Sequence, residues 1–405
     1  MNFLDRFFAP NRYTVMLAGV CALVLTMGIA RYAFTPMIPY MQAQTGMSEG
    51  LAGWLAGWSY IGYLCGLFMV WLMRDLRLKD YFFRYGLFIA VFTTAIMAFH
   101  DHRLVWYLSR FFAGISTALG FMLGTGLVLK WLIHNNQREE MGLHFAGAGI
   151  GIVVGALIVE FAANTLMGGL GWRGQWLTLA VFGSLLLIPA FVLMPKPQAD
   201  QIEESVQISR VGEPSTRWLT LLTIAYICAG FSNTVNITFT SLITEYIPLE
   251  KQGTVMWMYV GLAAAPAPFV WDRIARRVGY LNAIRGAFAV NIASNFLMTA
   301  GESYIAIVMS SVLFGFAFMG IVSLTLSIIG NKYRYRATQV MAQLTLGYCI
   351  AQILSPIIAG QIAETSGSFN LALFAVSGIM MLGMVCLSMM KREGHQVSLT
   401  EHQMS

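Results

Sequence analysis

Charged residues and recognisable catalytic motifs are what this sequence most clearly lacks. Charged residues make up 11% of the 405 positions, against about 25% in an ordinary soluble domain. The five cysteines lie in apolar stretches without metal-type spacing, which favours small core residues. No Walker motif, metal-type His/Asp/Glu cluster or serine nucleophile elbow stands out. We therefore expect no enzyme, no ATP-driven pump, no cofactor and no metal.

Long apolar stretches follow one another through the chain, and each is long enough to cross a hydrocarbon core about 30 Å thick. Their length and their content of Gly, Ala and Met indicate helices, because barrel strands are shorter and alternate polar with apolar residues. The 39 glycines suit close helix packing in lipid. Two prolines, Pro266 and Pro268, predict a kink in the eighth stretch. The sequence predicts an all-α membrane protein with twelve transmembrane helices, at about 13–40, 50–73, 81–99, 104–132, 139–165, 174–194, 217–247, 252–271, 281–300, 303–330, 337–363 and 368–390.

Basic residues divide unevenly between the two sides that these spans define. If the N-terminus is cytoplasmic, 20 of the 25 Lys and Arg residues fall on the cytoplasmic side. Three fall outside, and the remaining two, Arg31 and Arg110, lie within predicted spans. The positive-inside rule then predicts that both termini are cytoplasmic. Topology accounts for most of the net charge of +6, so we expect no nucleic-acid partner.

A polar linker divides the predicted spans into two sets of six. We expect an N-terminal six-helix bundle at 1–194, a cytoplasmic linker at 195–217, a C-terminal bundle at 218–392 and a cytoplasmic tail at 393–405. Short matches recur between the halves at offsets of 200 to 205, which pair Arg31 with Asn236 and Arg110 with Ser311. Together these matches predict two pseudo-symmetric bundles related by an axis along the membrane normal.

Several motifs resemble those of the major facilitator superfamily over nearly the whole chain. They are Arg110-x-x-x-Gly114 in span four, the glycines from Gly147 to Gly155 in span five, and degenerate gating loops at 74–79 and 272–279. More narrowly, 28–39 and 352–360 resemble a bacterial branch of YbfB type. The resemblance implies a fold of two six-helix bundles around a central cavity lined by spans one and four. It also implies a monomer in the bacterial inner (cytoplasmic) membrane.

Arg31 and Arg110 are the strongest functional candidates. A guanidinium inside a membrane helix costs from about 2.5 kcal/mol upward, so such groups usually face a protein interior or a wet cavity. At 1.5 Å per residue, both fall in the outer half of the N-terminal bundle. Two converging guanidinium forks could hold a carboxylate or phosphate bidentately. The alternative is that each arginine caps backbone carbonyls or braces a pair of helices.

The matching positions in the second half are neutral, so the predicted cavity is lopsided. Asn233 and Asn236 lie at helical spacing on span seven and could form hydrogen bonds to the polar groups of a substrate. Tyr32 and Tyr348 are further substrate-binding candidates. For each asparagine alone, hydrogen bonding between neighbouring helices is an equally good interpretation.

Glu160 in span five is the candidate for proton coupling, because an intramembrane carboxylate beside an arginine can load and release a proton. A static salt bridge or an interfacial position facing water are its alternatives. The gating candidates are Asp75, Arg77, Glu245, Arg273 and Arg277.

These features predict a secondary transporter that uses alternating access, and we favour a proton-linked carrier of small organic anions such as carboxylates. Its expected partners are a small-molecule substrate, the lipid bilayer and protons. One alternative is an efflux carrier for apolar or cationic compounds, in which Arg110 is structural. Another, of a different class, is a non-transporting membrane sensor or receptor.

Overall fold

The computed structural model describes residues 10–73, 75–137, 142–197, 214–245, 253–300, 303–333 and 337–390. Most of the predicted linker, all of the predicted tail and the side chain of Glu245 lie outside this description. All regular elements in the described ranges are helices. This confirms the predicted all-α class.

The helices of the first half are interrupted twice by π-helical turns. Span one is one continuous stretch, Arg12–Thr45, built from α2, η1 and α3. Span four is built from α6, η2 and α7. The elements are α2 (Arg12–Leu23), η1 (Val24–Tyr32), α3 (Phe34–Thr45), α4 (Glu49–Leu72), α5 (Leu76–Ile96), α6 (Arg103–Ala118), η2 (Leu119–Leu123), α7 (Gly124–His134), α8 (Gly142–Ala163), η3 (Leu166–Leu170) and α9 (Trp172–Val192).

The helices of the second half include one broken span. α11 and α12 meet at an angle of 43°, at the position where Pro266 and Pro268 predicted a kink. The elements are α10 (Thr216–Glu245), α11 (Gly253–Ala264), α12 (Ala267–Val278), α13 (Tyr280–Ala300), α14 (Tyr304–Lys332), α15 (Ala337–Ser366) and α16 (Asn370–Met389).

Most of these helices are suited to a bilayer. Nine helical stretches of the described chain are long and apolar enough to cross a membrane, and the bent pair α11–α12 makes a tenth. α5 and α13 are 21 residues each and lie where spans three and nine were expected, but charged or amide side chains lower their hydropathy. The number twelve therefore stays a prediction that rests on these two helices.

Equivalent contacts in the two halves demonstrate the internal repeat. Ser109 Oγ donates a hydrogen bond to the Thr93 carbonyl at 2.7 Å, and Ser310 Oγ donates one to the Ser294 carbonyl at 2.8 Å. Both members of the second pair lie 201 positions after those of the first. Gly114 and Gly315, also 201 apart, each press against a carbonyl of the neighbouring helix. The same side chains therefore make the same helix contacts in each half.

Two arginines extend the repeat to the helix ends. The Arg84 guanidinium donates to the carbonyls of Phe191 and Met194 at the end of α9. Arg285, 201 positions later, donates to the carbonyls of Leu387 and Met390 at the end of α16. Cations are favourable at helix C-termini, where the last carbonyls lack partners within the helix.

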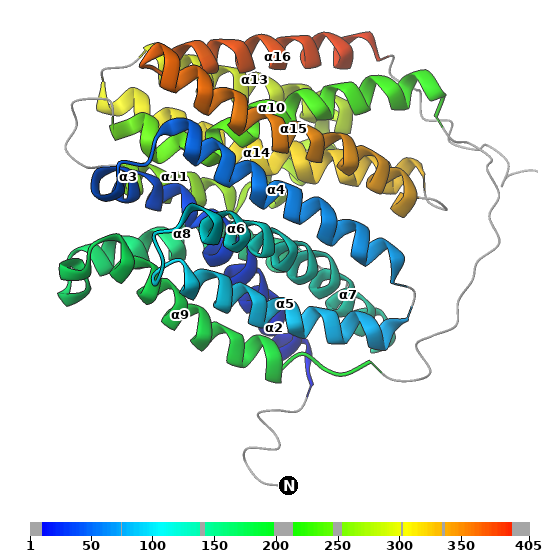
Figure 1. The fold of residues 1–405 in the computed structure, drawn as a ribbon. Coiled ribbons are helices and arrows are strands. Elements are labelled where there is room, and N and C mark those ends of the chain that lie inside the picture. The colour runs from blue at the N-terminus through cyan, green and yellow to red at the C-terminus, as the bar shows by residue number, and fades with distance from the viewer. Residues whose placement is uncertain are drawn as a thin grey trace, which may run out of the picture.

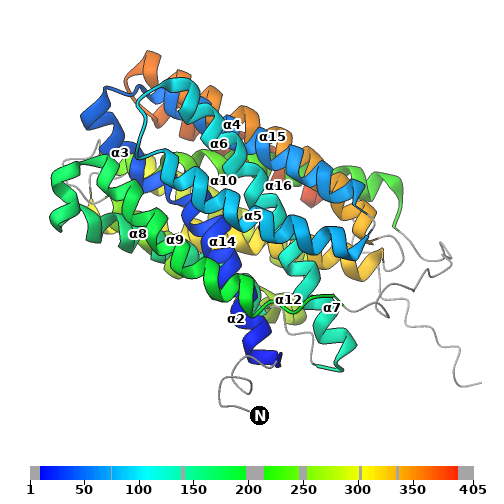
Figure 2. The same ribbon diagram turned by 60° about the horizontal axis from the view of Figure 1, so that its bottom comes forward.

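The two halves meet along paired helices. Figure 1 shows α10, α13, α15 and α16 above the helices of the first half, with α4 beside α15, and Figure 2 shows the same neighbours. α3 contacts α10, and α8 contacts α11. Glycines allow this close approach, since a Cβ on Gly53 of α4 would lie 2.3 Å from the Pro356 carbonyl oxygen of α15. These contacts enclose a cavity between the halves.

Candidate functional site

A π-helical segment positions Arg31. The turn η1 begins where α2 ends, and Ala33 N bonds to the Gly28 carbonyl at 2.8 Å, the five-residue spacing of a π-helix. The wider turn leaves carbonyls for other helices: Ala30 O accepts from Arg110, and Thr26 O accepts from Thr117. Such segments are rare and often occur at functional sites.

Three tyrosines surround the Arg31 guanidinium. Its Cζ lies 4.5 Å from the ring centroid of Tyr63, 4.7 Å from that of Tyr60 and 5.6 Å from that of Tyr32. The residue is 8% exposed, and its Nε has no hydrogen-bond partner. No carboxylate of the described chain forms a salt bridge with it. Ring faces therefore stabilise this cation where a carboxylate would be expected.

Arg110 is buried more deeply. It is fully buried, and its Cζ lies 5.3 Å from the Phe34 ring and 5.4 Å from the Trp176 ring. Its Nη2 donates to the Ala30 carbonyl at 2.9 Å, while its Nε has no partner. The alternative interpretation, capping of a backbone carbonyl, thus holds for one of its N–H groups. Salt bridges to Arg110 are absent from the described residues.

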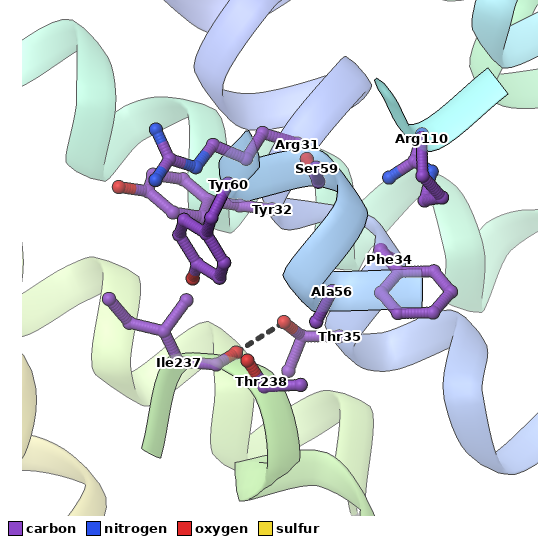
Figure 3. A pocket seen from close by; sticks show the side chains of 10 residues that line it. All are labelled: Arg31, Tyr32, Phe34, Thr35, Ala56, Ser59, Tyr60, Arg110, Ile237 and Thr238. Carbon is purple, nitrogen blue, oxygen red and sulfur yellow. Dashed lines mark hydrogen bonds between the residues drawn. The ribbon is translucent and has the colours of Figure 1, made fainter. Parts of the chain in front are cut away.

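Both arginines line one small cavity between the halves (Figure 3). The space open to the centre of a water molecule is about 20 Å³, room for about one water. The second half contributes Ile237 and Thr238 of α10, and the Thr35 hydroxyl donates to the Ile237 carbonyl. The cavity is therefore closed tightly in this conformation. The first half contributes Arg31, Tyr32, Phe34, Thr35, Ala56, Ser59, Tyr60 and Arg110.

The two guanidiniums do not converge as the sequence suggested. Figure 3 shows the Arg31 guanidinium beside Tyr60 and Tyr32, whereas Arg110 lies on the other side of the lining near Phe34. They share no ring among their aromatic contacts. The two guanidiniums therefore form two separate positively charged sites on the cavity lining.

Asn233 and Asn236, the two asparagines predicted to bind substrate, belong to a buried hydrogen-bond network. Asn236 Nδ2 donates to Asn295 Oδ1 at 2.9 Å, and Asn295 Nδ2 donates to Ser232 Oγ at 2.9 Å. Ser232 Oγ donates to Asn291 Oδ1 at 2.8 Å. This network joins α10 to α13, so Asn236 makes the hydrogen bonds between neighbouring helices that were the alternative interpretation.

The same hydrogen-bond network ends at the hydroxyl group of Tyr348. Asn291 Nδ2 donates to Asn233 Oδ1 at 3.0 Å, and Asn233 Nδ2 donates to the Tyr348 hydroxyl at 3.1 Å. The Tyr348 ring stacks on Tyr226, with centroids 4.5 Å apart. Neither Asn233 nor Tyr348 belongs to the lining of the described cavity, whereas Tyr32 does. The network therefore fixes the position of the Tyr348 hydroxyl.

Close contacts also revise the predicted pairing of Arg31 with Asn236. Gly28 packs on Gly151, and Gly230 packs on Ala351, so these parts of spans one and seven correspond at an offset of 202. That offset places Asn233 opposite Arg31. The counterpart stays neutral, and the lopsided charge of the two halves is retained.

Glu160 lies near the end of α8 and is half-buried. Its Oε1 accepts a hydrogen bond from Asn164 Nδ2 at 2.8 Å, and it forms no salt bridge with Arg31 or Arg110 in the described chain. It does not line the cavity. The static salt bridge to either arginine is therefore not formed in the described chain, and the role of Glu160 in proton coupling stays a prediction.

Four of the predicted gating residues can be placed by their side chains, on α5 and on α12. Asp75 is the N-cap of α5 and accepts from the Arg77 amide at 2.9 Å, whereas Arg273 and Arg277 are exposed on α12. The ion pairs in these regions use other residues, which are Asp80 with Arg84 and Asp272 with Arg276. The gating role stays a prediction.

Sequence analysis missed the hydroxyl and aromatic part of the lining. Ser59, Tyr60 and Thr238 line the cavity, and Tyr63 contacts Arg31. In an apolar run, a tyrosine or a serine is too common to mark a site. The signal that could have found them is spacing, because Ser59, Tyr60 and Tyr63 recur on one face of span two.

Comparisons with known proteins agree with this architecture. The sequence model of the family described as "Uncharacterised MFS-type transporter YbfB" matches residues 23–388. Among curated proteins, the chain is 24% identical over 322 residues to "Probable sulfoacetate transporter SauU" of Cupriavidus necator. That alignment covers 71% of this chain and 72% of the relative.

Solved structures show the same fold at low sequence identity. A crystal structure of a variant of the nucleoside transporter NupG has a TM-score of 0.74 and 11% identity, and covers 93% of this chain and 99% of that chain. The human organic anion transporter MFSD10 (TETRAN) has a TM-score of 0.66 and 17% identity, covering 93% of this chain and all of that one (100%). At these identities the likeness establishes the fold alone.

Proposed function

Because this chain belongs to the YbfB-type family of major facilitator superfamily transporters, we propose that it carries small organic anions across a membrane by alternating access. Carboxylates and sulfonates are the substrate class that its site suits. The transporter class follows from the family, and the anion class is argued from the site.

One observation carries the anion class: Arg31 is a buried cation without a carboxylate partner in the described chain, and one of its N–H groups is unpaired. An uncompensated charge in such a place costs several kcal/mol, because solvation by water has been lost. A bound anion would restore the missing charge and the missing hydrogen bond together. The similarity to the probable sulfoacetate transporter of Cupriavidus necator supports the same class.

Alternating access requires the closed contacts around the cavity to open. The hydroxyl contact between Thr35 and Ile237 joins α3 to α10, and Gly53 and Gly57 press α4 against α15. In the proposal, the uneven distribution of basic residues supports cytoplasmic termini in a bacterial inner membrane, which puts these contacts on the outer side. In the proposal, they separate when the site faces outward and close again over the bound anion.

Proton linkage is the second part of the proposal, with Glu160 as the proton carrier. Glu160 is half-buried near the end of α8 and accepts a hydrogen bond from Asn164, and in the proposal it takes up and releases the coupled proton. Binding of a proton there would offset one negative charge of a co-transported anion.

Purified protein in liposomes tests the proposal. We expect uptake of labelled sulfoacetate or malonate when the outside is made acidic, and loss of that uptake in Arg31→Gln. Efflux of a cationic dye that is unchanged in Arg31→Gln, without anion uptake, would instead favour the efflux carrier. Anion binding without any flux would favour a receptor.

A further inference from the structure

We infer that the substrate is a short dianion with an acidic group at each end, one for Arg31 and one for Arg110. This inference rests on the proposed function and specifies its substrate class. It starts from the separation of the two guanidiniums along the lining of one cavity (Figure 3).

Charge balance is the first argument. Both guanidiniums are more than nine-tenths buried, and neither has a carboxylate partner within the described chain. A monoanion would neutralise one of them and leave the other as an uncompensated buried charge. A dianion neutralises both, so the site gains more from two acidic groups than from one.

Hydrogen-bond geometry is the second argument. Arg31 and Arg110 each have a buried Nε–H without a partner. The contacts of Arg31 with the rings of Tyr60 and Tyr63 leave this Nε–H without a partner. Figure 3 shows the two side chains on different sides of the lining, so two acidic groups on one short molecule give each guanidinium a hydrogen-bond acceptor of its own.

The space between the two cations favours a short and partly polar body. Ser59 lines the cavity, its buried Oγ has no hydrogen-bond partner, and Figure 3 shows it between the two guanidiniums. Thr238 lines the cavity from the second half. A cavity with room for about one water must widen for any substrate, which favours a backbone of few carbons over a long one.

Exchange between matched anions tests this inference. Liposomes loaded with unlabelled anion are given labelled anion at pH 7, using sulfoacetate against methanesulfonate and malonate against its monomethyl ester. We expect the wild-type protein to exchange each dianion about tenfold faster than its matched monoanion, or more. In Arg31→Gln and Arg110→Gln one cation remains, so dianion exchange should fall and the ratio should approach one.

Arg110→Lys is the matched variant that keeps the charge, and it should keep a preference for the dianion. If Arg110→Gln does not fold, the wild-type ratios and Arg110→Lys still decide the question. Equal exchange of mono- and dianions by the wild type would overturn the inference and leave the proposed anion carrier standing. Exchange of neither kind of anion would overturn the proposed function itself.

Discussion

The packing of Gly114 against α4 allows a sharp test of the site's framework. A Cβ added to Gly114 would lie 1.9 Å from the Ser59 carbonyl oxygen and 2.7 Å from the Tyr63 backbone nitrogen. Ordinary contacts begin near 3.4 Å, and both neighbours are backbone atoms that cannot rotate away. Gly114→Ala therefore forces α6 away from α4. Two of the tyrosines that surround Arg31, Tyr60 and Tyr63, lie on α4.

The magnitude follows from two opposing effects. Forcing an extra carbon into a packed interface costs about 1–3 kcal/mol. Replacing glycine by alanine inside a helix gains up to about 1 kcal/mol. With the full gain from alanine, the expected net change is a loss of up to about 2 kcal/mol in stability. Because Arg110 lies one turn before Gly114, the same displacement should also weaken anion binding.

Thermal unfolding of the detergent-solubilised protein measures this effect, with Gly126→Ala as the control. Gly126 lies farther along the same span, and a Cβ there would meet nothing within 4 Å. We expect Gly114→Ala to melt below the wild type and Gly126→Ala to melt at or above it. If Gly114→Ala melts as high as Gly126→Ala, the close contact between α4 and α6 does not exist and the argument fails.

Three further changes probe other parts of the molecule. Asn295→Ala removes two buried side-chain hydrogen bonds, so we expect a loss of about 1–3 kcal/mol in thermal unfolding, and an unchanged melting temperature would contradict the network. Arg285→Gln leaves carbonyls at the end of α16 without their cation, and unfolding should show a loss of about 1–2 kcal/mol, which a neutral result would refute. Glu160→Gln should abolish anion uptake driven by a proton gradient but keep anion exchange, whereas the control Asn164→Ala should keep both activities. If Glu160→Gln still takes up anions in response to a proton gradient, Glu160 does not carry the coupled proton.

The sequence revealed the cations and the repeat because both are strong signals in an apolar background. Arg31 and Arg110 were prominent since no carboxylate lies near them in sequence, and the structure finds both on one cavity. The family match confirms the recognition of the superfamily and of its YbfB-type branch. The bend after α11 was predictable from Pro266 and Pro268, because a proline in the interior of a span removes a backbone hydrogen bond.

The directions in which the site's side chains point could not be predicted from the sequence. Whether the two guanidiniums converge depends on helix rotation. The π-helical segment that contains Arg31 alters that rotation, and no residue type in the sequence signals such a segment. The amides of Asn291 and Asn295 carried a readable signal, because their four-residue spacing puts both on one face of α13 toward Ser232. The ion pairs near the gating loops involve Asp80 rather than Asp75, since Asp75 caps a helix.

Binding of a small dianion at Arg31 is the central claim, and calorimetric titration of sulfoacetate and of malonate into the purified protein tests it most directly. The account predicts a measurable affinity in the wild type for at least one of them. It predicts binding weaker by at least about tenfold in Arg31→Gln, without a lower melting temperature of the unliganded variant, because an uncompensated buried charge has been removed. Equal affinity in Arg31→Gln and in the wild type would contradict it.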